Sequence, residues 1–428
     1  MNFQLPPLLR ARTLVDPVNA REQLLAQVSA VSGIEWLPVA AASGRCLATV
    51  QIAGIALPRF DNSAVDGFGI HAEDMTAAMP LRLQIVAGIC AGDQPNRADF
   101  HPGTTLRILT GAAVPADMAA VIPEEAVVRN LDTITCTKTL SHGANIRRRG
   151  EDVAPGLELL QPGTRLDPRH LALLAAAGVS RVPVVRRIRV GVLSMGNELV
   201  EPGETVAEGR IADSNRPMLL SALAEPALEP VDLGIFSDKT DLLVQALQTA
   251  APAIDLLITS GGVFGSEADH LARALLDAGG TCTSIHLALR PGKPTAFGRL
   301  AGMQVLGLPG NPVAALIHYL LFVRPTLARL GGIKTILDFS RTARTAAVFR
   351  HKPGRTEFVP AKIIGYNTEG IPYLEKLGRG GSARLLPLTQ ADGLAEMPAE
   401  AEDIAEGELI RFHPFAGLFP RGNNTTTL

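Results

Sequence analysis

Apolar residues recur along the chain in two different patterns, and the first pattern occupies the middle of the chain. Within residues 187–332, short apolar runs alternate with stretches in which apolar side chains recur at helical spacing. The pattern predicts strands at 188–193, 255–259, 284–289 and 303–308, and helices at 217–224, 239–251, 268–278 and 312–330. Alternation of strands and helices predicts a parallel sheet wrapped by helices, which is an α/β domain.

The second pattern consists of short alternating runs bounded by glycine, proline and aspartate. Residues 81–86 and 104–109 alternate in this way, so residues 51–150 are predicted to form a β-rich module. Residues 333–428 return to short strands and turns, which predicts a C-terminal β domain.

Helices are also predicted near the N-terminus, after Asp16-Pro17, and at 168–178. We expect these two helices to pack together, so that residues 1–50 and 151–186 form one discontinuous N-terminal and linker domain. The predicted fold is therefore multidomain, with a parallel-sheet α/β domain, a β-rich module, a small discontinuous helical domain and a C-terminal β domain.

Composition narrows the classes of function. The chain has 428 residues, too many for one core, and its 40 basic and 42 acidic side chains give a net charge of -2. Near-neutral charge and 4% aromatic residues argue against a nucleic-acid or membrane partner. The four cysteines form no Cys-x-x-Cys pair, and neither a signal peptide nor an apolar run of about 20 residues is present. We therefore expect a cytoplasmic protein with reduced thiols.

Three loops follow apolar runs of the α/β domain, at 260–269, 290–294 and 307–312. Ligands bind such sheets beyond the carboxyl ends of their strands. Gly261 and Gly262 would let a ligand approach the backbone closely, and Asp269 suits a magnesium–phosphate site. Helix capping explains an acid at this position equally well.

The other two loops suit an anion. Arg290 and Lys293 place two cations around a Pro-Gly turn, although a surface turn would look the same. Pro309 and Gly310 offer backbone, and Asn311 precedes a long helix whose first amides could bind an anion or simply be capped.

Further polar groups follow other strands. A fourth strand end carries Ser194, Gly196 and Glu198, while residues 213–215 read as a helix cap or as support for a ligand. In the β-rich module, residues 57–69 contain two acids, one of which is Asp66. This segment is either an ordered turn or the acidic part of a cleft, and Thr110 could line the same cleft.

Several chemistries find no signature in the sequence. The nine histidines lack metal-ligand spacing, and His318 reads as a core or helix-surface residue. Neither a Gly-x-Ser-x-Gly elbow nor a Walker phosphate loop is present, which disfavours covalent catalysis and ordinary kinase or ATPase chemistry.

In their order along the whole chain, these motifs resemble the molybdopterin molybdenumtransferase family, which includes the bacterial MoeA proteins and the gephyrin E domain. The motifs that carry the resemblance lie at 58–67, 110–112, 145–152, 196–199, 213–215, 260–269, 291–294 and 307–312.

The resemblance implies a reaction in which adenylylated molybdopterin is cleaved in the presence of molybdate and Mg²⁺, AMP leaves, and the dithiolene gains molybdenum. It also implies a homodimer whose cleft lies between the α/β domain of one subunit and the β-rich module of the other. Molybdopterin adenylyltransferase and molybdoenzymes or their chaperones are the partners it implies.

By motif match, the resemblance assigns roles to individual residues. Asp66 and Thr110 would reach the cleft from the partner's side, and Asp269 with Asp238 would hold the cation or orient the phosphate. The remaining matches are catalytic Glu198 and Lys293, and ligand-binding Ser194, Gly196, Gly261, Gly262, Arg290, Pro309, Gly310, Asn311 and Ser382.

The chain departs from the family pattern at four positions that could touch the oxyanion. Arg290 and His286 stand where lysine occurs, Ala314 replaces a serine, and Pro360 replaces an arginine. These departures keep open a second function, that of a molybdopterin carrier or scaffold without insertion activity. Nucleotide hydrolysis on the same α/β domain is a further alternative, against which the β-rich module with Asp66 argues.

Overall fold

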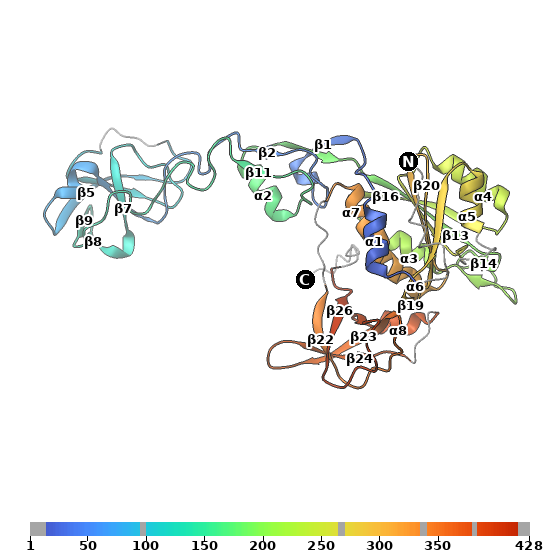
Figure 1. Cartoon of the computed structure of the whole chain (residues 1–428). Coiled ribbons are helices and arrows are strands. Elements are labelled where there is room, and N and C mark those ends of the chain that lie inside the picture. Colours follow the sequence, from blue (N-terminus) through green and yellow to red (C-terminus); the bar gives the residue numbers. More distant parts are fainter. Residues whose placement is uncertain (1–13, 95–99, 264–269, 334–339, 379–382, 418–428) are drawn as a thin grey trace.

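The computed structural model describes residues 14–94, 100–263, 270–333, 340–378 and 383–417, and its chain is elongated (Figure 1). The β-rich module lies at one end. A linker of short strands joins it to the α/β domain, and the C-terminal β domain packs beside the latter (Figure 1).

The α/β domain is built on a six-stranded sheet. Its parallel part has the order β16 (Leu228–Phe236), β13 (Ile188–Met195), β17 (Leu256–Ser260) and β21 (Met303–Leu308). The sheet continues with β20 (Pro294–Leu300) and β18 (Thr281–His286), which are antiparallel to their neighbours. The sequence pattern predicted neither β16 nor β20. β20 runs antiparallel because only Ala301 and Gly302 join it to β21, and so short a turn permits no crossover.

Helices cover both faces of this sheet. On one face, α4 (Thr240–Ala250) and α5 (His270–Asp277) share a core with Leu193 and Met195 of β13. The other face carries α3 (Asn215–Ala222), α6 (Pro312–His318), the π-helical turn η5 (Tyr319–Val323) and α7 (Arg324–Leu330). Val190 and Val192 of β13 point to that second face, as strand alternation requires. The buried strands therefore place their carboxyl ends at one edge of a rigid layer.

Helix α1 (Pro17–Leu25) packs on α7 and η5, with Ala20 and Leu24 in the core of the α/β domain. Helix α2 (Pro168–Ala176) contacts instead η2 (Val39–Ala41) and β11 (Glu158–Leu160). The expected packing of the two helices on each other is therefore wrong. The reason lies just before α1, where Val15 exchanges backbone hydrogen bonds with His286 and Ala288 and so fixes the chain to the sheet.

The linker brings two distant segments side by side. Strand β1 (Ile34–Pro38) pairs with β12 (Arg181–Val185), and β2 (Gln51–Ile52) pairs with β11. Leu47, Leu166 and Leu174 form its small core.

The β-rich module and the C-terminal domain are both built from short strands, as the sequence predicted. The first sheet has the order β7 (Met118–Pro123), β4 (Gly67–His71), β6 (Thr104–Ile108), β5 (Leu81–Ile89), β9 (Thr133–Cys136) and β8 (Val127–Asn130). It is accompanied by the pair β3 (Asn62–Ser63) and β10 (Ile146–Arg147), and by the short helices η3 (Ala72–Thr76) and η4 (Glu124–Ala126).

The C-terminal domain closes into a barrel because its long strand β23 pairs at both edges. The ring has the order β23 (Thr356–Tyr366), β24 (Pro372–Lys376), β22 (Arg341–Thr345), β26 (Leu409–Pro414) and β25 (Gly393–Met397), and it carries α8 (Leu385–Gln390). Strand β19 (Leu289–Arg290) of the α/β domain adds to β23 and so ties the two domains together.

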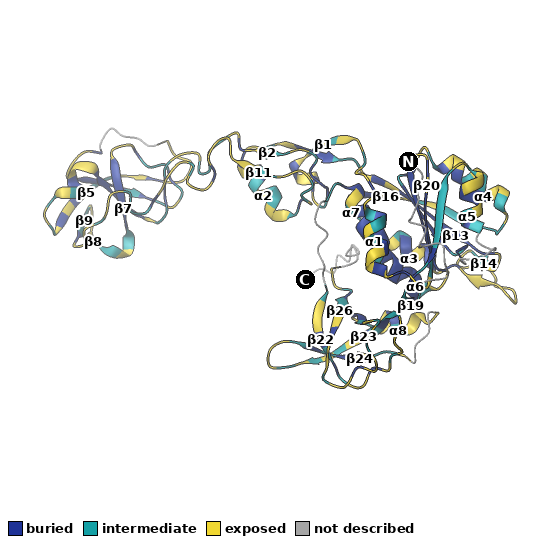
Figure 2. Ribbon diagram, in the orientation of Figure 1, coloured by how far each residue is buried: buried dark blue, intermediate teal, exposed yellow. Residues whose placement is uncertain are grey.

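Burial follows these layers (Figure 2). Among the described residues, one helix, Pro312–Leu330, is long and apolar enough to cross a membrane, but 72% of its apolar window is buried inside the protein. This helix therefore belongs to the core of the α/β domain.

Candidate active site

The ends of four parallel strands meet at one edge of the sheet and form the candidate site. The Gly261 amide donates to the Leu308 carbonyl (3.0 Å), which joins the ends of β17 and β21. The Gly196 amide donates to the Phe236 carbonyl (3.1 Å), which joins β13 to β16. The ends of these four strands therefore lie side by side, as the carboxyl ends of parallel strands must.

Backbone forms much of this edge. Gly261 and Gly262 have φ values of +85° and +71°. A Cβ on Gly261 would stand 2.3 Å from the Met195 carbonyl oxygen, and one on Gly262 would stand 2.6 Å from the Met195 methyl group. Gly310 lies beside Gly261. Only glycine combines the left-handed backbone with this close approach, so the end of β17 packs directly against Met195, while the Cβ side of Gly310 is open.

The side chain of Asn215 connects two of the loops by hydrogen bonds. Its Nδ2 donates to Ser260 Oγ and to the Gly310 carbonyl, both at 2.7 Å. Its Oδ1 is buried and, like Ser194 Oγ and Thr259 Oγ1, has no hydrogen-bond partner among the described residues. Buried polar atoms in native proteins are almost always paired, so these oxygens indicate a polar ligand or water at the strand ends.

The segment 213–215 serves as the helix cap that the sequence suggested. Asp213 Oδ1 accepts from the amides of Asn215 (3.1 Å) and Arg216 (3.2 Å). Arg216 is buried among Asp213, Asp232 and Glu201, whose carboxylates raise the pKa of its guanidinium against the cost of burial. This network fixes the start of α3 and with it the side chain of Asn215.

The two predicted cations differ in their surroundings. The Lys293 side chain is exposed and forms no hydrogen bond or ion pair with any residue the structure describes, so its ammonium is available to a ligand. Arg290 forms an ion pair with Glu357 of the C-terminal barrel (Nη1–Oε2, 3.2 Å). The Glu357 carboxylate is also 3.0 Å from Nδ1 of His351.

Gly292 holds this loop close to helix α6. A Cβ on Gly292 would stand 2.4 Å from Cε1 of His318 and 3.4 Å from Cβ of Ala314. His318 is a core residue, one of the two positions the sequence allowed, and burial lowers its pKa to about 4. Ala314, which replaces a serine of the family pattern, is also buried, so the missing hydroxyl would have stood directly behind this loop.

Two carboxylates stand at the other end of the site. Glu198 folds over Gly196, whose Cβ position is 2.5 Å from Oε2 of the glutamate. Asp238 follows β16, and its amide donates to Asn197 Oδ1 (3.2 Å). Asp269 and Ser382 lie outside the described residues. Within the described ranges, no three His, Cys, Asp or Glu side chains form a metal-binding group.

Asp66 and Thr110 are close together but are far from these loops within one chain. Asp66 Oδ1 accepts from both the amide and the hydroxyl of Thr110, each at 2.7 Å. These two bonds, the amide first, lower the pKa of the Asp66 carboxyl. The pair is exposed in the β-rich module, at the opposite end of the molecule from the α/β domain (Figure 1).

The basic triplet at 147–149 is partly neutralised. Arg148 forms an ion pair with Asp61 (2.7 Å), and the Arg149 amide donates to the same carboxylate (2.8 Å). These interactions join the segment 145–152 to the turn that carries Asp66, since β10 pairs with β3.

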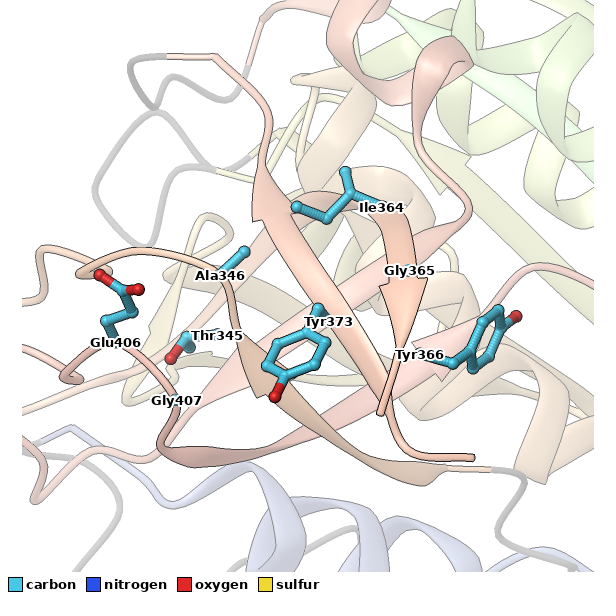
Figure 3. A pocket seen from close by; sticks show the side chains of 8 residues that line it. All are labelled: Thr345, Ala346, Ile364, Gly365, Tyr366, Tyr373, Glu406 and Gly407. Carbon is cyan, nitrogen blue, oxygen red and sulfur yellow. The ribbon is translucent and has the colours of Figure 1, made fainter. Parts of the chain in front are cut away.

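A pocket of about 450 Å³ lies elsewhere, in the C-terminal barrel (Figure 3). Tyr366, Tyr373, Ile364 and Glu406 are among the residues that line it, and none of the predicted site residues does. The strand-end edge carries the loops, Lys293 and the carboxylates, so we place the candidate active site there.

Sequence reasoning missed the contribution of Glu357 and His351. No local pattern marks them, because their role depends on the parallel pairing of Arg290 with Glu357 between β19 and β23, 67 residues apart.

Models of known families match three successive parts of the chain. The MoeA N-terminal region (domains I and II) matches residues 15–178, a probable molybdopterin-binding domain matches 191–329, and the MoeA C-terminal region (domain IV) matches 342–415. The second match contains all the strand ends described above.

Relatives of known name match nearly the full length. The molybdopterin molybdenumtransferase of Haemophilus influenzae is 35% identical, covering 94% of this chain and 98% of its own, and that of Bacillus subtilis is 29% identical, covering 94% and 95%. The crystal structure of a MoeA molybdopterin biosynthesis protein from Pyrococcus horikoshii superposes with a TM-score of 0.76 at 31% identity, covering 94% of this chain and 99% of that one. The chain belongs to the MoeA family of molybdopterin molybdenumtransferases.

Proposed function

We propose that this protein is a molybdopterin molybdenumtransferase, which cleaves adenylylated molybdopterin, releases AMP and transfers molybdenum from molybdate to the dithiolene. The observation that carries the proposal is the row of strand-end loops, in which glycine backbone and Lys293, whose side chain has no partner among the described residues, lie at the same edge of the sheet. The family membership and the names of the relatives support the same reaction.

The loops at the strand ends form a crevice, and its residues have different roles according to their chemistry. Gly310 leaves the backbone open to the nucleotide and pterin phosphates, since a Cβ there would meet no atom closer than 3.8 Å, and Gly261, Gly262 and Pro309 supply the adjoining main chain. Lys293 and Arg290 hold the oxyanion, and Ser194, Gly196 and Asn311 complete the lining.

Carboxylate oxygens are the donors that Mg²⁺ prefers, and Glu198 and Asp238 form no ion pair with any described residue. Asp238 and Asp269 are the residues we assign to Mg²⁺, with Glu198 as a further catalytic carboxylate. A bound magnesium ion would neutralise charge that develops on the phosphate oxygens.

Two copies of the chain are needed to complete this site. Asp66 and Thr110 lie at the opposite end of an elongated protomer from the crevice, so only a second copy can bring them there (Figure 1). We therefore propose a homodimer with an intersubunit site, to which Ser382 would also contribute. The cytoplasm is the expected compartment, and molybdopterin adenylyltransferase and molybdoenzymes or their chaperones are the expected partners.

The test is anaerobic incubation with adenylylated molybdopterin, Mg²⁺ and molybdate, with AMP and molybdenum-loaded product as readouts. Lys293→Ala is expected to lower kcat/KM by about 10² or more, since it removes a charge-assisted contact. Lys362→Ala is the matched control, because this exposed lysine lies on the barrel outside the crevice, and its activity should equal that of the wild type.

Tight binding of adenylylated molybdopterin without AMP release would instead support the carrier function. Asp269→Ala separates the two further, because it should abolish turnover while leaving the fold intact. Normal turnover of that variant would contradict the role assigned to Asp269.

A further inference from the structure

We propose that Glu357 is a positioning residue for Arg290, so that the C-terminal barrel sets the affinity of the crevice for its oxyanion. The inference rests on the proposed function, in which Arg290 contacts that oxyanion. It adds a residue from a different domain, one that does not itself touch the ligand.

The backbone places these two side chains together. Strand β19 pairs in parallel with β23, with Arg290 opposite Glu357, and Arg290 Nη1 lies 3.2 Å from Glu357 Oε2. The two side chains are 30% and 12% exposed. An ion pair this protected from solvent is screened less than a surface pair, so it can hold an arginine that would otherwise be mobile.

A histidine supports the same carboxylate from behind. The His351 side chain is fully buried, with Nδ1 3.0 Å from Glu357 Oε2 and Nε2 3.0 Å from the Pro398 carbonyl. The ring therefore lies between the Glu357 carboxylate and a backbone carbonyl, and it packs against the carboxylate from inside the barrel. One oxygen of Glu357, Oε2, therefore lies within hydrogen-bonding distance of both Arg290 and His351.

The charges around Glu357 explain why the ion pair does not remove the positive charge of the region around Arg290. His351 also donates its amide to Asp403 (2.8 Å), which is paired with Arg350. Lys376 donates to the Arg350 carbonyl (3.1 Å). Arg355 and Lys376, like Arg290, interact electrostatically with Glu357, so the basic side chains Arg290, Arg350, Arg355 and Lys376 outnumber the carboxylates Glu357 and Asp403.

The charge of Arg290 acts on two of these neighbours. Burial, and after it the proximity of Arg290, lowers the pKa of Arg355. Burial also lowers the pKa of Lys376, where Glu357 and Asp403 act in the opposite direction and Arg290 in the same one. Glu357 thus fixes the guanidinium while the region as a whole remains attractive to an anion. The guanidinium has five N–H groups, so a bond through Nη1 leaves donors for the ligand.

The direct test is calorimetric titration of molybdate into wild type, Glu357→Ala, Glu357→Gln, Arg290→Ala and the double variant. Releasing one side chain from a prearranged position costs about three- to tenfold in affinity. We expect Glu357→Ala to weaken molybdate binding by that factor. Glu357→Gln keeps an acceptor and should recover part of the loss.

Kinetics distinguish positioning from a general loss of structure. In the AMP-release assay, Glu357→Ala should raise the KM for molybdate by the same factor and change kcat less than twofold. The melting temperature of each variant shows whether the domains remain folded.

The double variant separates this inference from the function on which it rests. If Arg290 binds the oxyanion, Arg290→Ala weakens molybdate binding and removes any effect of Glu357→Ala. Wild-type affinity in Arg290→Ala would refute the role of Arg290 itself. Unchanged or tighter binding in Glu357→Ala, with Arg290→Ala impaired, would refute positioning and identify Glu357 as a competitor of the ligand.

Discussion

The crevice of the α/β domain and the Asp66–Thr110 pair of the β-rich module present their functional groups in different ways. In the crevice, buried strand ends and glycines with positive φ present backbone, and Asn215 holds two loops together from a buried position. In the β-rich module, two exposed side chains bond to each other at the surface.

The two regions differ in how far their functional atoms also stabilise the fold. The atoms that shape the crevice are also packing and hydrogen-bonding atoms of the sheet, so a change there affects binding and stability at once. Asp66 and Thr110 contribute little to any core. The protein can therefore alter the second region chemically without unfolding, but not the first.

The largest effect that tests this contrast is expected from adding one methyl group. Gly261→Ala would combine a left-handed backbone with a Cβ 2.3 Å from a carbonyl oxygen, and should lower the free energy of unfolding by about 3 kcal/mol or more. Gly111, beside Thr110, has a similar φ of +82°, but its nearest neighbour would be 3.7 Å away.

Gly111→Ala is therefore the matched control, and should cost only the backbone strain of about 1 kcal/mol. Urea denaturation of both variants gives the comparison. Equal losses would show that the crevice is no more tightly packed than the β-rich module.

A smaller effect is expected from pH. The pKa of His318 is about 4 in the folded protein because the ring is buried, against about 6.5 when unfolded. The unfolded chain binds the proton more tightly, so this contribution to stability is complete above pH 6.5 and is lost as the pH falls toward 4. Between pH 7.5 and pH 5 the loss is about 2 kcal/mol.

His318→Gln, which does not titrate, should show a correspondingly smaller loss of unfolding free energy over the same interval. The Asp66 carboxyl, whose pKa is lowered by Thr110, contributes in the same direction but at lower pH, since its share is lost only as the pH falls below the ordinary range of a carboxyl. An identical pH dependence in wild type and His318→Gln would contradict the neutral, buried state of this histidine.

The smallest effect on stability is expected at Thr110. Thr110→Val removes the hydroxyl bond to Asp66 but keeps the amide bond, so the free energy of unfolding should change by less than about 0.5 kcal/mol. AMP release should nevertheless fall by about tenfold, because the Asp66 carboxylate loses one of the two bonds that orient it. Thr76→Val, at another exposed threonine of the module, is the control and should retain full activity.

Much of the architecture could be read from local patterns. The strands β13, β17 and β21 and the helices that follow β16, β17 and β21 have periodicities that depend only on neighbouring residues. Because parallel strands end at a common edge, the sequence also predicted that Gly261, Gly310 and Lys293 would share one site. The order of the motifs identified the family.

Other features depend on contacts between residues far apart in the chain. Val15 hydrogen bonds to the end of β18 and thereby assigns α1 to the α/β core, against the prediction that it packs with α2. The ion pair of Arg290 with Glu357 arises from the pairing of β19 with β23.

The sequence by itself therefore determined the elements, the glycines that expose the backbone, and the cations of the crevice, because each follows from local periodicity and residue chemistry. Only the tertiary structure decided that Arg290 is held by a carboxylate, whereas the Lys293 side chain has no partner among the described residues. Two similar cations acquire different roles because strand pairing, which no local pattern encodes, brings Glu357 to one of them and not to the other.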